Sequence, residues 1–462
     1  MSDHPQLVII GAGPAGLAAA SVANEHNINT VVLDDQPASG GQIYRGIDSS
    51  SDKLRGILGA SYTKGRALLP NAQPSGSVTW IHCALVWQVD PDGTVYYTCN
   101  SGSRSVKANH VILATGAQER PMPFPGWTLP GVMTAGAVQI ALKSSALIPD
   151  GKLVLAGSGP LLYLLAVQVL KAGGGVSALV DTTPRANSIR SISSLPGMFK
   201  AGALLRDGLG LLVEMRKRKI KRYRYATDLE AVGKSQLTGL RFSSGGREHE
   251  QDCQVLAVHN GVVPNVQISR QLGLMHDWQD VQRCWHPQRS DITQTALPWL
   301  QIAGDGGGIL GAEASELQGQ LAAYSVAAII QTENTATISQ NKERARKALL
   351  PLQSARPFID ILYAPSDEFL NPSDKTIVCR CEEVTAGEIR HFVAMGCTGP
   401  NQTKAFGRPG MGPCQGRYCG LTVSEIIARE RAVSMQEVGY YRIRPPIKPI
   451  MLADIAALPE DN

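Results

Sequence analysis

Hydrophobic residues near the N-terminus fall in short continuous runs, each followed by a polar or glycine-rich turn. Leu7–Ile10 is such a run and predicts a strand, whereas the apolar stretch that opens at Leu17 predicts a helix. Thr30–Leu33 predicts a second strand, and a continuous apolar run is typical of a parallel strand buried on both faces. The pattern therefore predicts a strand–helix–strand unit at the start of the chain.

The turn between the first strand and the helix is rich in glycine. It reads Gly11-Ala-Gly13-Pro14-Ala15-Gly16, a complete G-x-G-x-x-G fingerprint. Gly11 allows the tight turn, Gly13 lets the backbone approach a pyrophosphate, and Gly16 lets the helix pack on the strand. The helix N-terminus would then face the phosphates. These residues predict a nucleotide site.

An acidic pair follows the second strand. A carboxylate at this position accepts hydrogen bonds from the ribose hydroxyls of a bound dinucleotide. Asp35 is the first choice for this role and Asp34 the second, because the alternation of side chains leaves open which one points inward.

The same arrangement recurs in the middle of the chain. Strands are predicted at Lys152–Ala156 and Ser177–Val180, with the turn Gly157-Ser-Gly159-Pro-Leu-Leu162 between them and Asp181 after them. In both units 24 residues separate the first glycine from the acid. We therefore expect two tandem domains of one architecture, with Gly157, Gly159 and Asp181 as candidate nucleotide contacts in the second.

Leu162 stands where the third glycine of the second fingerprint belongs. A leucine side chain there would hold the helix away from the strand. Three alternatives stay open for the second unit: a nicotinamide nucleotide, another adenine nucleotide, or an empty structural copy.

Each unit is expected to close with a further apolar strand. His110–Leu113 leads into Thr115 and Gly116, and Val255–Val258 closes the second unit. After the second unit, the strand Trp299–Ile302 ends in Gly304-Asp305 before an alanine-rich helix. Asp305 could contact a polyol phosphate or could simply cap the helix.

Composition limits the function classes. The chain has 462 residues with 43% hydrophobic and 18% charged residues, which indicates a globular protein of several domains. No apolar run is long enough for a membrane span, and the N-terminus lacks the basic region of a signal peptide, so we expect a cytoplasmic protein.

One basic segment accounts for the net charge of +5. Seven of the nine residues from Arg216 to Arg224 are basic, and without them the net charge would be negative. Nucleic-acid binding is therefore not predicted for the protein as a whole. A solvated helix end running into an edge strand explains the run, and a contact with a partner protein or an acidic membrane surface is the alternative.

Five of the nine cysteines lie close together near the C-terminus. Four of them follow the pattern C-x-C-x32-C-x4-C, a set that suits metal rather than disulfides in a cytosolic chain. Four thiolates hold a [2Fe–2S] cluster, with zinc as the main competitor. Glycines around the second pair allow backbone N–H groups near the sulfurs. The predicted ligands are Cys379, Cys381, Cys414 and Cys419, and Cys397 is expected to be a buried structural thiol.

The order of these motifs resembles the two-dinucleotide-binding-domain flavoproteins related to thioredoxin reductase. That resemblance implies FAD held by the N-terminal unit and the returning segment, with Asp305 near the ribityl and phosphate groups. It also implies that Gly41 and Gln42 lie along the flavin. No C-x-x-C pair occurs, so a disulfide relay is not expected.

The stretch from Cys379 to Gly420 resembles the bacterioferritin-associated-ferredoxin-like [2Fe–2S] domain, including Lys404 and Arg408. This resemblance favours the cluster over zinc. It also implies small supporting helices near Glu388–Met395 and Thr422–Arg429.

The whole chain resembles the α subunits of heteromeric opine oxidases, D-hydroxyproline dehydrogenase and the B subunit of hydrogen cyanide synthase. The resemblance implies an electron-transfer subunit, a substrate-oxidising β subunit similar to glycine and sarcosine oxidases, and sometimes a small ferredoxin-like γ subunit. It leaves open an FMN at a subunit boundary and peripheral attachment to the inner membrane through the complex. The alternatives are a stand-alone NAD(P)H-dependent reductase and a scaffold subunit. No catalytic base is predicted in this chain.

The expected fold is α/β, with two tandem Rossmann-like domains and a small C-terminal ferredoxin-like domain. The predicted boundaries are 1–120 with 285–330 for the FAD-binding domain, 121–284 for the second dinucleotide-binding-like domain, 331–374 for a linker, 375–435 for the [2Fe–2S] domain and 436–462 for an extended tail suited to docking on a neighbour.

Overall fold

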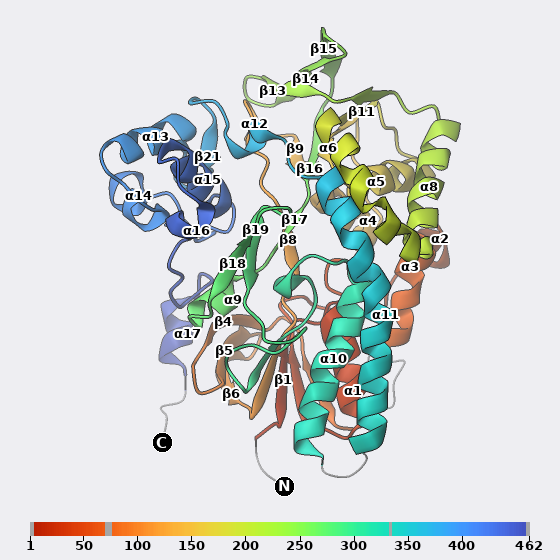
Figure 1. Cartoon of the computed structure of the whole chain (residues 1–462), viewed down its shortest axis with the longest axis vertical. Helices are drawn as coiled ribbons and strands as arrows, with labels where there is room; N and C mark the ends of the chain where they lie inside the picture. Colours follow the sequence, from red (N-terminus) through yellow and green to blue (C-terminus); the bar gives the residue numbers. More distant parts are fainter. Residues whose placement is uncertain (1–3, 70–75, 332–334, 459–462) are drawn as a thin grey trace.

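A computed structural model describes residues 4–69, 76–331 and 335–458 and contains two five-stranded parallel sheets (Figure 1). The first sheet has the order β20-β7-β1-β2-β3, and β1 pairs in register with both β2 and β7. Its strands are β1 (Leu7–Ile10), β2 (Thr30–Leu33), β3 (Val78–Ile81), β7 (His110–Leu113) and β20 (Leu300–Ile302).

Both faces of this sheet are covered. Leu7 and Ile9 lie in a core with α1 (Pro14–Glu25) and α10 (Ala312–Ile330). Val8 and Ile10 face the opposite core, beneath the sheet β4 (Leu85–Val89), β5 (Thr94–Cys99) and β6 (Gly102–Lys107). Burial on both faces is the reason that these strands are continuous apolar runs.

The second sheet repeats the first, with the order β12-β11-β10-β16-β9. Its strands are β9 (Val132–Thr134), β10 (Leu153–Ser158), β11 (Ala178–Asp181), β12 (Arg222–Arg224) and β16 (Val255–Asn260). On one face lie α4 (Ala135–Ser145), α5 (Pro160–Lys171) and α8 (Gly202–Lys217). On the other lies the sheet β13 (Thr227–Gly233), β14 (Leu237–Ser244) and β15 (Arg247–Asp252).

The basic segment Arg216–Arg224 runs from the end of α8 into the edge strand β12. This is the solvated helix end and edge strand expected from the sequence. No described helix is both long and apolar enough to cross a bilayer.

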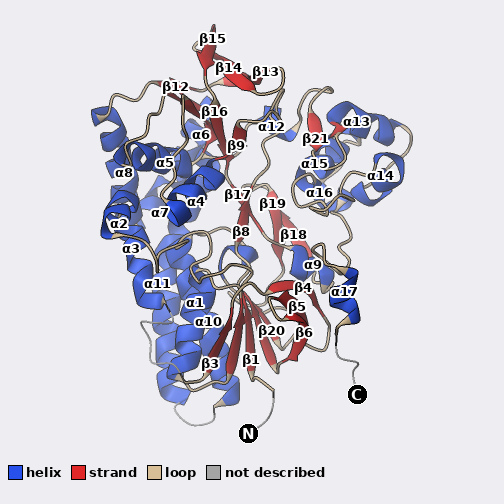
Figure 2. Ribbon diagram, turned by 180° about the vertical axis from the view of Figure 1, so that it is seen from behind, coloured by secondary structure: helices blue, strands red, loops and turns tan. Residues whose placement is uncertain are grey.

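Two short antiparallel strands connect the units. The chain leaves the first unit through β8 (Ala117–Glu119) and comes back through β17 (Val262–Pro264), which pairs with β8. The hairpin β18 (His276–Gln279) and β19 (Cys284–Pro287) follows before β20 rejoins the first sheet (Figure 2). The first unit is therefore discontinuous in sequence.

Residues 331–374 differ from the expected linker. Most of them form the 28-residue helix α11 (Thr335–Leu362), which runs beside α10 and contains Pro351 and Pro357 (Figure 1). Its buried side chains are Ile338, Ala345, Leu349 and Ala355. The segment looks like a linker in sequence because one narrow buried stripe anchors an otherwise polar helix.

The C-terminal module begins with β21 (Ile377–Cys379) and β22 (Val384–Thr385). It continues with α13 (Ala386–Ala394), α14 (Pro400–Gly407), α15 (Gly420–Glu430) and α16 (Met435–Val438). Both expected supporting helices are present, as α13 and α15. The remaining helices are α2 (Asp52–Leu58), α3 (Ala60–Thr63), α6 (Arg185–Arg190), α7 (Leu195–Lys200), α9 (Gln267–Gln271), α12 (Asp367–Leu370) and α17 (Leu452–Ala456).

The C-terminal segment is not the free extended tail that the sequence suggested. It contains α16 and α17, and the side chains of Tyr441, Ile443 and Ile447 are buried in the core that the module shares with the first sheet. Burial of these apolar side chains within their own chain lowers the free energy of the folded protein.

Candidate functional site

The first glycine turn lies at the carboxyl ends of the parallel strands, where α/β sheets bind ligands. Gly11 has a φ of 106°, and a Cβ atom there would lie 2.5 Å from the carbonyl oxygen of Ala114. A Cβ atom on Gly16 would lie 1.8 Å from the carbonyl oxygen of Gly11. Both glycines are therefore required by close backbone contacts, as the fingerprint predicts.

Asp34, the second choice from the sequence, is the acid that faces the glycine turn. Its carboxylate accepts hydrogen bonds from the backbone N–H groups of Ala12, at 2.5 Å, and Gln36, at 2.8 Å. Burial raises its pKa. Asp35, the first choice, instead points to the surface and forms an ion pair with Lys448 at 2.8 Å. Burial opposes the effect, but Lys448 holds the pKa of Asp35 below its usual value.

The turn at Gly40–Gln42 lies directly against the glycine fingerprint. The backbone N–H of Gly40 donates to the carbonyl oxygen of Ala12 at 2.8 Å, and a Cβ atom on Gly41 would lie 2.7 Å from the Cα of Gly13. The neighbouring Ser39 hydroxyl is buried without a hydrogen-bond partner. Close backbone and an unpartnered hydroxyl are what a nucleotide-binding cradle requires, so these residues fit a dinucleotide.

Lys143, from α4 of the second unit, reaches this turn. Its ammonium donates to the carbonyl oxygen of Gln42 at 3.0 Å and lies 5.9 Å from the ring centre of Tyr62. Burial, together with Arg45, lowers the pKa of Lys143 to about 7. The sequence offers no signal for this contact, because Lys143 is one lysine on a helix 101 residues from Gln42.

The returning segment joins the site from the other side. A Cβ atom on Gly306 would lie 3.2 Å from the hydroxyl of Thr115 and 3.4 Å from the carbonyl oxygen of Gly116. Asp305 uses one carboxylate oxygen to accept from the N–H groups of Leu310, at 2.8 Å, and Gly311, at 2.9 Å. Asp305 therefore holds the loop before α10, but it is not the N-cap residue of that helix, which is Gly311.

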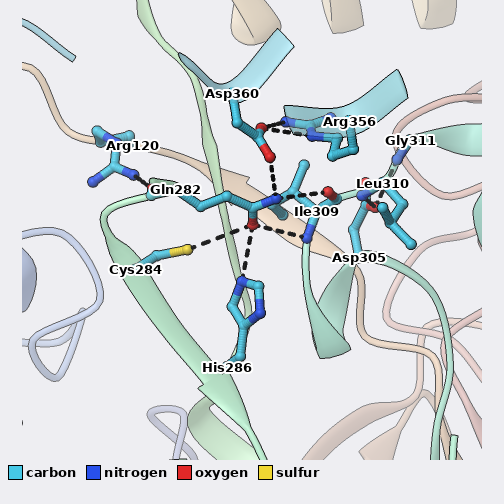
Figure 3. A network of polar contacts seen from close by, with 10 residues as sticks. All are labelled: Arg120, Gln282, Cys284, His286, Asp305, Ile309, Leu310, Gly311, Arg356 and Asp360. Carbon is cyan, nitrogen blue, oxygen red and sulfur yellow. Dashed lines mark hydrogen bonds and ion pairs between the residues drawn. The ribbon is translucent and has the colours of Figure 1, made fainter. Parts of the chain in front are cut away.

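A polar network behind Asp305 holds this loop in place (Figure 3). The side chain of Gln282 accepts from Ile309 N at 3.3 Å and donates to Ile309 O at 3.0 Å and to Asp360 at 2.8 Å. Arg120 fixes the Gln282 loop by donating to its carbonyl oxygen at 2.6 Å. The ring of His286 lies 2.9 Å from the side-chain oxygen of Gln282 and is part of the same network.

The second glycine turn differs from the first in the backbone of its second glycine, because φ is 130° at Gly159 and −77° at Gly13, and in the surroundings of its acid. Asp181 accepts from the hydroxyl of Tyr163 at 2.7 Å, from Arg222 at 2.6 Å and from Thr183 N at 3.0 Å. Only 7% of the Asp181 side chain is exposed, and it differs from Asp34, whose two oxygens accept from backbone N–H groups, in being paired with a cation, Arg222. Leu162 is buried in the core under α5.

Glu119 and His259 meet where the two units connect. Glu119 lies 2.7 Å from the His259 ring and also accepts from Gly136 N, in the first turn of α4, at 2.9 Å. A Cβ atom on Gly159 would lie 2.8 Å from the same ring. His259 thus fills the space beside the second glycine turn, and its role is structural.

The four predicted cysteine ligands come together as two pairs. Cys419 is the neighbour with the largest effect on the pKa of the Cys379 thiol, and Cys414 affects the pKa of the Cys381 thiol, so the four thiols lie as two neighbouring pairs. Among the described residues, no group of three or more His, Cys, Asp or Glu side chains is arranged to hold a metal ion. Each iron of a binuclear cluster takes two thiolates, so two thiol pairs match the donor set that it requires.

Backbone N–H groups point at the sulfur of Cys379. The Cys419 thiol, with the N–H groups of Gly410, Glu382 and Cys381, lowers the pKa of Cys379 to about 6 against the effect of burial. The thiolate is the form that binds metal. Cys397, expected as a structural thiol, is buried.

Two tyrosine rings pack against three glycines of the module. Cβ atoms on Gly410 and Gly416 would lie 2.6 and 2.5 Å from the ring of Tyr441, and one on Gly420 would lie 2.5 Å from the hydroxyl of Tyr440. The Tyr441 hydroxyl lies 3.9 Å from the Cys419 sulfur. The glycines therefore admit aromatic rings as well as backbone amides.

The C-terminal segment ties this module to the first unit. Gln415 donates to Pro446 O at 2.7 Å, and Ile447 N donates to Trp87 O at 2.8 Å. Lys448 then pairs with Asp35. One short segment thus contacts both the cysteine loop and the nucleotide-binding unit.

Two family models match the chain. Residues 5–305 match the pyridine nucleotide-disulphide oxidoreductase family, and residues 373–458 match the sarcosine oxidase A3 domain. The first match agrees with the α/β architecture, and the second covers the cysteine module and most of the C-terminal segment.

Some relatives align with nearly the whole chain. The chain is 41% identical over 469 residues to the opine oxidase "A" polypeptide of Agrobacterium tumefaciens, covering 99% of this chain and 93% of the relative. It is 32% identical to hydrogen cyanide synthase subunit HcnB of Pseudomonas aeruginosa, covering 96% of each. The solved structure of L-proline dehydrogenase from P. horikoshii has a TM-score of 0.69 at 17% identity, covering 98% of this chain and 79% of that one.

Proposed function

The chain belongs to the pyridine nucleotide-disulphide oxidoreductase family and groups within it with the corresponding subunits of opine oxidases, and from this we propose that it is the electron-transfer subunit of a heteromeric flavin-dependent oxidase. The single observation that carries the proposal is the near full-length similarity to those subunits, combined with a dinucleotide cradle and a four-thiol module in one chain.

FAD is the nucleotide proposed for the first unit. The support is the close packing of Gly13 on Gly41, the inward carboxylate of Asp34 and the unpartnered Ser39 hydroxyl. In this role Asp34 would hold the ribose, the turn at Gly40–Gln42 would lie along the flavin, and Thr115 with Gly116 would line the ring. Asp305 would contribute to FAD binding indirectly, by holding the loop before α10 through the N–H groups of Leu310 and Gly311.

A [2Fe–2S] cluster is the group proposed for the cysteine module. Cys379, Cys381, Cys414 and Cys419 would be its ligands, and the Gly410 N–H would donate to the Cys379 sulfur. When bound, the flavin accepts electron pairs and the cluster passes single electrons; the protein contributes their placement and electrostatics.

The test of the cluster uses two cysteines of the same module. Iron and sulfide content should fall to background in Cys414→Ser, whereas Cys397→Ser, also in this module but outside the C-x-C-x32-C-x4-C pattern, should retain both. Full iron and sulfide content in Cys414→Ser would reject the assignment, and stoichiometric zinc in the unmodified chain would replace the cluster by zinc.

We propose that an opine or related amino acid is oxidised in a β subunit rather than here. The described part of this chain shows no arginine-and-base set in a substrate cavity, and the relatives named above are themselves subunits. The purified chain should not turn over opines, D-hydroxyproline, proline or glycine with an artificial acceptor, and activity should appear when a β subunit is co-expressed. Turnover by the chain alone at the rate of the complex would refute the subunit role.

The second unit is proposed to be a structural copy without a nucleotide. Its Asp181 is occupied by Tyr163 and Arg222, which argues against the stand-alone NAD(P)H reductase. Rapid NAD(P)H oxidation by the isolated chain, at about 1–10³ s⁻¹, would favour that alternative instead. The domain boundaries given from the sequence, a γ subunit, an FMN at a subunit boundary and attachment to the inner membrane through the complex stay predictions.

A further inference from the structure

Tyr441 lies beyond the last cysteine of the cysteine module, yet its side chain reaches into that module. It follows Cys419 by 22 positions in the sequence, and its side chain is only 2% exposed. Its hydroxyl oxygen lies 3.9 Å from the Cys419 sulfur, which is itself buried. A side chain outside the C-x-C-x32-C-x4-C pattern therefore contacts one of the four proposed ligands.

The ring of Tyr441 is enclosed by the cysteine loop and a helix. A Cβ atom on Gly410 would lie 2.6 Å from this ring, and one on Gly416 would lie 2.5 Å from it, so both positions leave the ring its space. Lys404, on α14, places its ammonium 4.7 Å from the centre of the same ring. The ring is therefore confined from several directions.

The backbone on both sides of Tyr441 is fixed by one asparagine of α14. The side chain of Asn401 donates to the carbonyl oxygen of Tyr440 at 3.3 Å. The same side chain accepts from the backbone N–H of Arg442 at 2.9 Å. Backbone and ring contacts together determine where the Tyr441 hydroxyl lies.

The chemistry of the two groups decides which one donates. A cysteine that binds metal does so as the thiolate, which can only accept a hydrogen bond. A phenol keeps its proton at neutral pH, since its ordinary pKa is about 10. Tyr441 is therefore the donor, and the Cys419 sulfur is the acceptor. The Cys379 sulfur, by contrast, has backbone N–H groups as neighbours, such as that of Gly410, which a side-chain substitution does not remove.

We propose that the Tyr441 hydroxyl donates a hydrogen bond to the Cys419 thiolate and thereby raises the reduction potential of the proposed [2Fe–2S] cluster. The inference rests on the proposed function, and Tyr441 acts through Cys419 as a positioning residue. Hydrogen bonds to the cysteine sulfurs help to set the potential of such clusters. Reduction by one electron, which the flavin supplies in the proposed relay, adds negative charge to the iron and sulfur atoms. A donor therefore stabilises the reduced state more than the oxidised state, and burial strengthens the difference.

A redox titration of the full-length chain, followed by EPR of the reduced cluster, measures this potential. Tyr441→Phe keeps the ring and removes only the donor. The contact is long for a hydrogen bond, so the expected effect is modest. The equilibrium constant for one-electron reduction should fall about threefold, which lowers the midpoint potential by about 30 mV at roughly 59 mV per tenfold change. The iron and sulfide content of the variant should equal that of the unmodified chain.

Tyr440→Phe is the matched control, because the Tyr440 hydroxyl donates to the carbonyl oxygen of Gly416 at 3.1 Å, a backbone acceptor rather than a sulfur. Its potential should equal that of the unmodified chain. An unchanged potential in Tyr441→Phe, or an equal shift in both variants, would overturn the inference and leave the cluster in place. Loss of the cluster from Tyr441→Phe would also overturn it, because the hydroxyl would then serve cluster assembly. Absence of iron and sulfide from the unmodified chain would overturn the proposed cluster, and this inference with it.

Discussion

The two dinucleotide-binding units share a backbone plan but differ at the two places where a nucleotide would touch them. In the first unit, Gly16 lets the helix approach the turn and Asp34 faces the backbone of the glycine loop. In the second, Leu162 fills the helix position and Asp181 is held by Tyr163 and Arg222. The comparison teaches that a repeated fingerprint preserves a fold more readily than it preserves a site.

The second unit also contacts the nucleotide-binding turn of the first. Lys143 on its helix α4 reaches the turn at Gln42, and the strands β8 and β17 connect the two sheets. The second unit therefore contributes contacts to the first site, whatever its own acid binds.

Exchanging the third residues of the two fingerprints should have the largest effect. Gly16→Leu places a Cβ atom 1.8 Å from the Gly11 carbonyl oxygen, so we expect flavin content to fall to background. Leu162→Gly removes a buried leucine and should lower the free energy of unfolding by about 3–5 kcal/mol, while the folded protein keeps its flavin. Flavin released on denaturation measures both.

The control for this exchange is Gly208→Ala, because a Cβ atom there has no neighbour within 4 Å. It should leave flavin content unchanged and, as an alanine inside helix α8, should raise the free energy of unfolding by at most about 1 kcal/mol. Normal flavin content in folded Gly16→Leu would show that the first turn is not the nucleotide site.

The next effect is expected from removing Arg222, the ion-pair partner of Asp181. Arg222→Met leaves a carboxylate that is 7% exposed without its cation, and should destabilise the fold by about 2–3 kcal/mol in urea unfolding. Arg241→Met, which breaks exposed pairs with Glu230 and Glu250, should cost about 0–1 kcal/mol. Equal losses of unfolding free energy in the two variants would mean that the ion pair between Arg222 and Asp181 does not stabilise the fold more than an exposed pair.

Substitutions in the acidic pair of the first unit distinguish Asp34, which faces the glycine turn in the structure, from Asp35, the first choice from the sequence. Asp34→Asn should weaken FAD binding about 10–100-fold, because a charged acceptor is worth roughly 1.5–3 kcal/mol. Asp35→Asn loses only a partly exposed ion pair with Lys448 and should change the dissociation constant about two- to threefold. A larger effect at Asp35 would restore the choice made from the sequence.

A further prediction concerns Lys143 and pH. The pKa of the folded lysine, about 7, lies below that of a free lysine, so the full cost of burying the ammonium is present below pH 7. Stability should therefore rise as pH increases from 7 through the pKa of the unfolded chain, which is about 10.4. Lys143→Met should gain about 4 kcal/mol more relative to the unmodified chain at pH 6 than at pH 10, by urea unfolding, because each pKa unit of the shift is worth about 1.4 kcal/mol. A pH-independent difference would contradict a buried, titrating amine.

Much of this fold can be predicted from short sequence patterns. The strands Leu7–Ile10 and Thr30–Leu33 lie where their apolar runs predicted, and the equal spacing of the two fingerprints indicated the repeated sheet. The long helix α11 was missed, because its buried positions form a narrow stripe between polar residues and two prolines.

The amino-acid sequence by itself determined which residue types stand at each turn, strand end and cysteine position, since these depend on neighbours within a few residues. Only the tertiary structure decided how they are used: Asp34 rather than Asp35 faces the turn, and Arg222 closes Asp181 from 41 residues away. Lys448 reaches Asp35 across 413 residues. The physical reason is that the role of a carboxylate depends on its hydrogen-bond and ion-pair partners. Tertiary packing brings those partners together from distant parts of the sequence.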